Sequence, residues 1–187
     1  MVPLAQLWIP ILLSAVFVFI ASSILHMMLK FWHQPDCSGF SNEEEVRAAV
    51  RKGSSGPGIY MLPYCTHDNM KSAEIQQKFK DGPIAFVFIR PGGQPNMAAP
   101  LIQWFLFCLL VSLVTAHIAG GTLAAGTAPM RVFCVSGLAA LMGHAFGSIP
   151  MGIWWGQPWR SAFKHVIDGI IYALVVAGVL AWLWPQQ

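Results

Sequence analysis

The chain has 187 residues, of which 56% are hydrophobic and only 10% are charged, and its formal net charge is +3. Soluble globular domains carry about 25% charged residues, so this composition excludes an ordinary water-soluble fold. The small net charge and the lack of a basic patch give no support to nucleic-acid binding. Seven of the eight acidic residues lie between Asp36 and Asp81, and the eighth is Asp168, inside an apolar segment.

Four long apolar segments follow in chain order, and each is near the roughly 20 residues that a helix needs to cross a bilayer. Backbone amides in lipid have to be bonded within their own segment, which favours helices. The first segment has no basic residue before it and no clear cleavage site, so we expect it to be retained as a helix. The four segments are residues 4–29, 101–119, 132–151 and 162–184.

The predicted fold class is therefore all-α membrane: a four-helix transmembrane bundle with a small α/β extramembrane insert between the first and second helices. The predicted parts are transmembrane helix 1 at residues 1–32, the insert at 33–99, and the other three helices at 100–187. Lysine and arginine are concentrated in the insert and in the turn after the third helix, whereas the other side holds only Arg131. The positive-inside rule then places the insert in the cytoplasm and both termini outside.

Turn residues divide the insert into a helix, a strand, a second helix and a second strand. Ser41 followed by Glu44 is typical of a capping box, which predicts that the first helix starts there. An insert of this size buries little core by itself, so we expect it to lean on the bundle or on a partner. The predicted elements are residues 43–52, 59–63, 72–80 and 84–89.

One group in the insert carries the thiol and imidazole donors that zinc or copper prefers, namely His33, Cys37, Cys65 and His67. The His-x3-Cys and Cys-x-His spacings match no standard zinc-finger pattern. A disulfide between Cys37 and Cys65 is the alternative if the insert is periplasmic. The favoured interpretation is two unlinked thiols and two surface histidines, with no structural metal.

Polar side chains inside the apolar segments form a second group. Such residues are costly in a bilayer and usually face the bundle interior. Asp168 shares a helix face with His165 and Tyr172, which are three and four residues away. Because the helices alternate in direction, polar residues from four helix ends should converge on the side of the insert. The predicted cluster is His26, Gln103, His144, His165, Asp168 and Tyr172.

Several interpretations of this cluster stay open. The favoured one is a hydrogen-bonded network that locks the helices together, with Asp168 accepting a hydrogen bond from His144 or His26. The second is a proton- or ion-handling site. The third is a metal or haem site in which His26, His144 and His165 are ligands. The last is that some of these side chains snorkel to the interface.

The third apolar segment has signals for packing and for its end. Gly143 and Gly147 are four residues apart, a spacing at which small residues let membrane helices approach closely. Pro150 is expected to end or kink this helix. Ser161 is expected to cap the fourth helix.

Several sequence runs are similar to those of a group of uncharacterised bacterial four-helix inner-membrane proteins. They are GSIPMGIWWGQPWRSAFKHVIDGIIYAL and WLWP near the C-terminus, with GPGIYMLPY and GPIAFVFIRPGG in the insert. The resemblance covers nearly the whole chain and implies a multi-pass protein of the bacterial inner membrane. It implies no activity and no functional residue.

The sequence contains no haem-attachment motif and no nucleotide-binding loop. We therefore expect a structural or accessory subunit of a larger membrane complex rather than an enzyme, with no cofactor. Its partners would be the lipid bilayer and either other membrane subunits or further copies of itself. The alternative is a small transporter, or a redox protein that binds a metal or haem at the intramembrane cluster.

Overall fold

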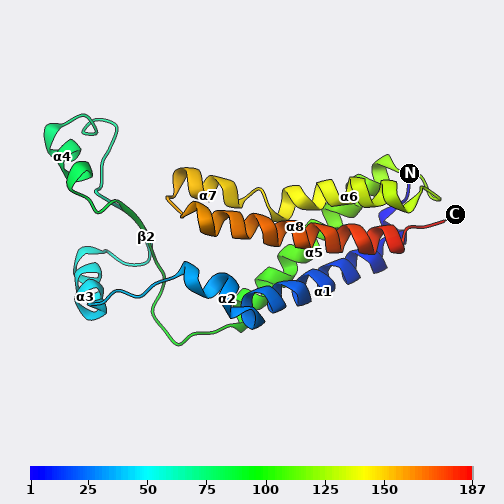
Figure 1. Ribbon diagram of the computed structural model, residues 1–187, viewed down its shortest axis with the longest axis horizontal. Helices are drawn as coiled ribbons and strands as arrows, with labels where there is room; N and C mark the ends of the chain where they lie inside the picture. The colour runs from blue at the N-terminus through cyan, green and yellow to red at the C-terminus, as the bar shows by residue number, and fades with distance from the viewer. Residues whose placement is uncertain (187) are drawn as a thin grey trace. The chain divides into compact units, whose positions relative to one another are not determined.

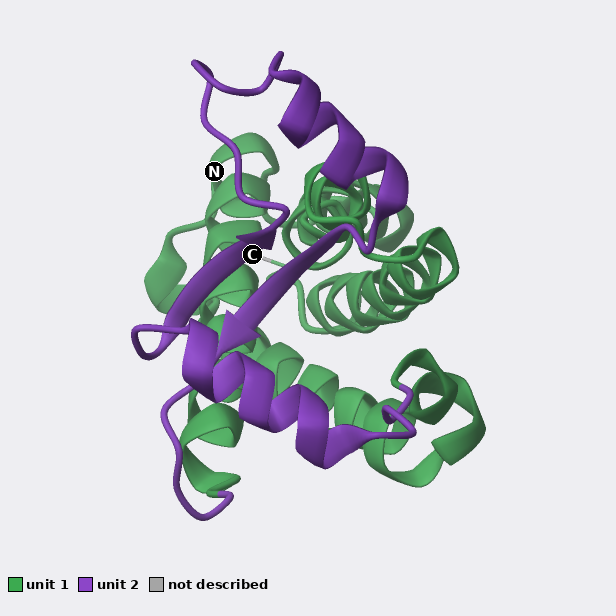
Figure 2. Ribbon diagram, turned by 90° about the vertical axis from the view of Figure 1, so that its left-hand side faces the viewer, with its two compact units in different colours: residues 1–37, 96–187 green, residues 38–95 purple. Residues whose placement is uncertain are grey.

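The computed structural model describes residues 1–186, and the chain divides into two compact units (Figure 2). Unit 1 comprises Met1–Cys37 and Asn96–Gln187, and unit 2 comprises Ser38–Pro95. His33, which the sequence placed in the insert, therefore belongs to the same unit as the long helices.

Unit 1 is built from long apolar helices that lie side by side (Figure 1). Four segments are long and apolar enough to cross a membrane, which confirms the predicted four apolar helices and indicates a multi-pass membrane protein. They are α1 with η2 (Trp8–Ser23 and Ile24–Met28), α5 (Ala98–Thr122), α6 with α7 (Pro129–His144 and Ser148–Trp154) and α8 (Trp159–Trp182). Short elements precede or follow α1: η1 (Leu4–Gln6), α2 (Lys30–His33) and η3 (Gln34–Asp36).

The core of unit 1 consists largely of small side chains. Helix α8 packs against α1 and α6, and α5 also packs against α1 and α6, so the four helices close into a bundle. Ala116, Ala140 and Ala177 are fully buried, whereas Leu110 and Leu138 are more than half exposed on the outside. Small residues inside and large apolar residues outside are typical of helices that pack within lipid.

Both chain termini lie at one end of the bundle, beside the loop between α5 and α6 (Figure 1). The N–H of Val2 donates to the carbonyl of Gly120, and the N–H of Gly126 donates to the carbonyl of Pro185. The ends of α1 and α6 and the starts of α5 and α8 therefore lie at the opposite end of the bundle, as the alternation of four helices predicts.

Glycine allows the closest approach of α8 to the end of α6. A Cβ on Gly169 would lie 2.6 Å from the Cα of Ala145, which is a backbone atom with no freedom to move aside. Gly143 faces α5, where a Cβ would lie 2.8 Å from a methyl of Val111, whereas Gly147 has nothing within 4 Å. Of the two glycines predicted to let helices approach closely, only Gly143 lies in a tight helix contact, whereas Gly147 faces open space.

The third span is interrupted as predicted, and one boundary of the fourth was wrong. Helix α6 ends at His144, and Pro150 lies in the first turn of α7, where its missing N–H costs nothing, so the break falls in the turn before the proline. Helix α8 starts after Pro158, which is its N-cap, so Ser161 lies within the helix. Proline favours helix starts because its φ is already suitable for a helix.

Unit 2 contains α3 (Glu43–Gly53), β1 (Gly58–Leu62), α4 (Ala73–Asp81) and β2 (Ala85–Ile89), in the predicted order of helix, strand, helix, strand. The strands pair antiparallel, with Gly58 opposite Ile89 and Leu62 opposite Ala85. Asn42, not Ser41, is the N-cap of α3, which corrects the capping-box prediction by one residue. Ile75 on α4 is buried, but Ile59 and Phe88 on the strands are more than half exposed.

Candidate metal centre

A bend after the first long helix brings a histidine of α2 against α8. The last turn of that helix, η2, is a π-helical turn that ends at Met28, and the φ of −86° and ψ of 68° of the next residue, Leu29, lie outside the helical region. Helix α2 then starts in a new direction and carries Trp32 and His33. As a result, side chains that follow the first span contact Asp168, although they are more than a hundred residues away in sequence.

Asp168 is the centre of the site and is 2% exposed. Its Oδ1 accepts a hydrogen bond from Nε1 of Trp32 at 2.8 Å, and its Oδ2 lies 2.6 Å from Nε2 of His33. The same Oδ2 is 3.9 Å from Nε2 of His26 and 3.9 Å from Nδ1 of His165. Three imidazoles from three different helical segments therefore converge on one carboxylate oxygen.

The three imidazole rings are stacked nearly parallel, with His33 in the middle. The ring centroids of His26 and His33 are 4.3 Å apart, and those of His33 and His165 are 5.0 Å apart. One ligand atom from each histidine and one from Asp168 all lie within 4.8 Å of one another. This arrangement gives a compact set of three nitrogen donors and one oxygen donor.

An ion pair supports His33 from its other side. Nδ1 of His33 lies 3.1 Å from Oδ2 of Asp36, and Nζ of Lys164 lies 2.5 Å from Oδ1 of Asp36. Lys164 also donates to the carbonyl of Trp32. The hydrogen bond from Lys164, with a smaller contribution from His33, holds the pKa of Asp36 below its ordinary value. A carboxylate on Nδ1 orients the ring and leaves Nε2 directed at the centre of the site, as is usual for metal-binding histidines.

The charges of the site do not balance when the histidines are neutral. Asp36 and Asp168 carry two negative charges, whereas Lys164 carries one positive charge, and all three side chains are largely buried. Both ring nitrogens of His33 face carboxylate oxygens, so Nε2 needs a proton or a cation between itself and Asp168. An uncompensated buried charge is costly, so the site favours one further positive charge.

The other residues of the predicted intramembrane cluster lie in different surroundings. The hydroxyl of Tyr172 is 3.5 Å from Nδ1 of His26, whereas Gln103 is exposed. His144 packs against Trp104, Phe107 and Tyr172, and neither of its buried ring nitrogens has a hydrogen-bond partner among the described residues. The expected hydrogen bond from His144 to Asp168 was therefore wrong. The other expected partner, His26, contacts Asp168 as an ion pair at 3.9 Å, and the hydrogen bonds of Asp168 are made with Trp32 and His33.

The predicted group of thiols and imidazoles is divided between the two units. His33 and Cys37 belong to unit 1, and Cys65 and His67 belong to unit 2. Both cysteines are free, and His67 is exposed.

The sequence interpretation missed Trp32, His33, Asp36 and Lys164 as members of the site with Asp168. Lys164 carried a usable signal, because it lies one helical turn before Asp168 on the same face. The remaining three follow the first span, and only the bend at Leu29 directs them to α8.

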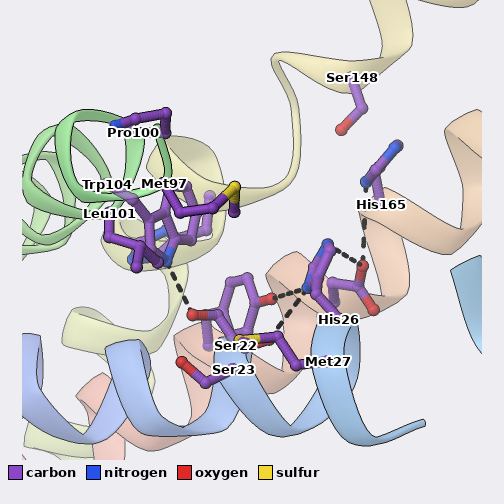
Figure 3. A pocket seen from close by; sticks show the side chains of 13 residues that line it. Ser22, Ser23, His26, Met27, Met97, Pro100, Leu101, Trp104, Ser148 and His165 are labelled. Carbon is purple, nitrogen blue, oxygen red and sulfur yellow. Dashed lines mark hydrogen bonds and ion pairs between the residues drawn. The ribbon is translucent and has the colours of Figure 1, made fainter. Parts of the chain in front are cut away.

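A cavity of about 480 Å³ borders the cluster, within unit 1 (Figure 3). His26, His165 and Asp168 line both the cavity and the cluster. An ion held by the cluster would therefore have a side that faces open space.

Comparison with known protein families, with curated proteins and with solved structures finds no match for this chain. The resemblance to bacterial inner-membrane proteins stays a prediction, and the function has to be argued from the geometry.

Proposed function

We propose that this chain is a multi-pass membrane protein that binds a divalent transition metal, such as zinc, through His26, His33, His165 and Asp168. The observation that carries the proposal is the convergence of these donors, whose ligand atoms all lie within 4.8 Å of one another. Imidazole nitrogens with one carboxylate oxygen are a donor set that suits zinc and similar divalent ions.

The charge and the surroundings of the cluster support the same proposal. A divalent ion supplies the positive charge that Asp36 and Asp168 require beyond Lys164. The contact of Asp36 with Nδ1 of His33 is the outer-shell support that metal-binding histidines usually have. Sites with a reactive or exchangeable metal keep one side open, and the cavity beside His26 and His165 supplies that side.

A small ion suits the cluster better than a haem. The ring centroids of His33 lie 4.3 and 5.0 Å from those of His26 and His165, so the rings leave no gap for a macrocycle. His144, which the haem hypothesis required, belongs to a separate aromatic contact with Trp104.

We further propose that the protein lies in a bacterial inner membrane with unit 2 in the cytoplasm, on the resemblance and on the distribution of lysine and arginine. The favoured sequence hypothesis, an accessory subunit of a membrane complex, stays a prediction. Exposed apolar side chains such as Leu110 and Leu138 suit lipid as well as a protein partner.

Metal analysis of the purified protein tests the proposal. We expect stoichiometric zinc or, after exchange, a cobalt derivative whose visible absorption reports nitrogen and oxygen ligands. The variants His26→Gln and His165→Gln keep a polar side chain of similar size, and each should weaken binding by about tenfold to a hundredfold or more. His67→Gln in unit 2 is the matched control and should bind like the wild type. Equal metal content in all four proteins would refute the site.

A further inference from the structure

The cavity beside the cluster has two chemically different walls. One wall carries the polar side chains of His26, His165 and Asp168, which belong to the proposed metal centre. Apolar side chains line much of the rest, including Met27, Met97, Pro100, Leu101 and Trp104 (Figure 3). A volume of about 480 Å³ is within the range of cavities that hold one small ligand.

The cavity is accessible from outside the bundle at its methionine rim. Met27 and Met97 both line it and are 62% exposed. Methionine side chains are flexible and adapt to apolar ligands of varied shape. The rim lies where the first candidate span ends and the second begins, which is the level of the lipid headgroups for helices that span a bilayer.

The indole of Trp104 is held in place at the apolar wall. Its Nε1 donates to Oγ of Ser22 at 2.7 Å, and its ring contacts Tyr172. The hydroxyls of Ser22 and Ser23 also donate to the carbonyl of Phe19. Trp104, Ser22 and Ser23 therefore have their polar groups satisfied within the protein, and His144 is the residue on this side whose ring nitrogens have no partner among the described residues.

The metal-loaded cluster would favour a negative charge in the cavity. With neutral histidines, a divalent ion and Lys164 carry three positive charges against the two of Asp36 and Asp168. One positive charge remains, in a largely buried site where charge interactions are strong. An anionic oxygen at the open side of the metal would neutralise it, whereas an amine would be repelled and an alcohol would leave the charge in place.

We propose that the cavity binds a fatty acid, with its carboxylate at the metal and its chain along Met27, Leu101 and Trp104. This inference rests on the proposed metal function, because without the ion the site has no net positive charge to attract the carboxylate. A single apolar chain with one carboxylate matches both walls of the cavity at once.

Binding of radiolabelled palmitic acid to the full-length protein in phosphatidylcholine nanodiscs tests this inference, with empty nanodiscs subtracted. We expect zinc-loaded protein to bind palmitic acid about tenfold more tightly than chelator-treated protein. Unlabelled hexadecanol and hexadecylamine should compete weakly. Leu101→Trp should fill the cavity and abolish binding, whereas Leu110→Trp, on the exposed face of the same helix, should not.

The outcomes separate the two proposals. If zinc binds stoichiometrically but palmitic acid does not, or binds equally well to chelated protein, the fatty-acid inference is wrong and the metal site stands. Equal competition by hexadecanol would also overturn it, because the carboxylate would then contribute nothing. If zinc itself fails to bind, the proposed function fails, and the inference fails with it.

Discussion

Two lysine–carboxylate pairs, one in each unit, have nearly the same geometry and very different surroundings. In unit 1, Lys164 lies 2.5 Å from Asp36, and the side chains are 9% and 11% exposed. In unit 2, Lys78 lies 2.6 Å from Glu74, and the side chains are 53% and 76% exposed. The first pair joins segments far apart in sequence, whereas the second links residues four apart on one helix.

The difference shows that the distance between the charged atoms of an ion pair does not measure how much the pair contributes to folding stability. Both carboxyl groups have a lowered pKa, and the main cause in each is the hydrogen bond from the lysine. Water and salt screen the exposed pair, so it contributes little to folding. The pair in unit 1 also contacts His33 and the carbonyl of Trp32, so breaking it leaves several largely buried groups unpaired.

Removing the central carboxylate should have the largest effect. Asp168→Leu leaves Trp32 and His33 without the buried carboxylate that both of them contact, at a cost of about 3–5 kcal/mol. Asp168→Asn keeps an acceptor for Trp32 and should cost less. Thermal unfolding in detergent, followed by circular dichroism, measures both. Wild-type stability of both variants would show that the network does not hold the helices together.

Replacing Lys164 by methionine should have the next largest effect. The variant leaves Asp36 without the ammonium group that balances it, although methionine fills much of the same volume. We expect a clear loss of thermal stability, smaller than for Asp168→Leu. A stability equal to that of Lys78→Met would contradict the contrast between the two pairs.

Adding a methyl group at the contact between α8 and the end of α6, next to Asp168, should destabilise unit 1 by an intermediate amount. Gly169→Ala would place a Cβ against the backbone of Ala145 and push α8 away, at a cost of about 1–3 kcal/mol. Gly178→Ala on the same helix meets nothing within 4 Å and should be neutral or stabilising by up to about 1 kcal/mol. Thermal unfolding of the two variants compares them directly, and equal stability would refute the close packing.

Replacing the unpaired imidazole should have a small effect, opposite in sign to that of Asp168. His144→Phe keeps a flat ring among Trp104, Phe107 and Tyr172 and removes two buried nitrogens that have no partner in residues 1–186. Stability should be unchanged or higher by about 1 kcal/mol, and zinc content should stay that of the wild type. A loss of zinc would show that His144 reaches the metal centre.

The smallest effect is expected at the exposed pair of unit 2. Because folding lowers the pKa of Glu74, its carboxylate stabilises the folded state above pH 4.5, the ordinary pKa of the group. This stabilisation is lost as the pH falls through the pKa of Glu74 in the folded state. Screening makes this contribution small at all pH values. Hydrogen exchange of α4 near neutral pH should therefore be nearly the same in Lys78→Met and the wild type. A large increase in exchange would show that unit 2 depends on this pair.

Much of the architecture could be predicted because it is encoded locally. Segments of about 20 apolar residues form helices wherever water is absent, and the turn residues of the insert delimit its two helices and two strands. The alternation of four helices predicted that polar residues from four helix ends would meet. Only the first and fourth of these ends supply residues to the Asp168 cluster, because Gln103 is exposed and His144 packs against Tyr172. Errors at Ser41 and Ser161 were small, because Asn42 and Pro158 begin helices equally well.

The membership of the site could not be predicted in the same way. The sequence places His144 and His26 at similar depths in the membrane. In the structure, however, His144 packs against Tyr172, whereas His26 forms an ion pair with Asp168. Which face of a nearly uniform apolar helix points inward depends on its rotation in the bundle, and apolar residues all around give no periodic signal.

The sequence by itself determined the long apolar helices, the order of elements in unit 2 and the isolation of Asp168 in an apolar segment, because these depend on local composition and spacing. Only the tertiary structure decided that His33 rather than His144 stands against Asp168. The reason is the bend at Leu29, which carries His33 from the expected insert to α8 and completes a site from residues distant in the chain.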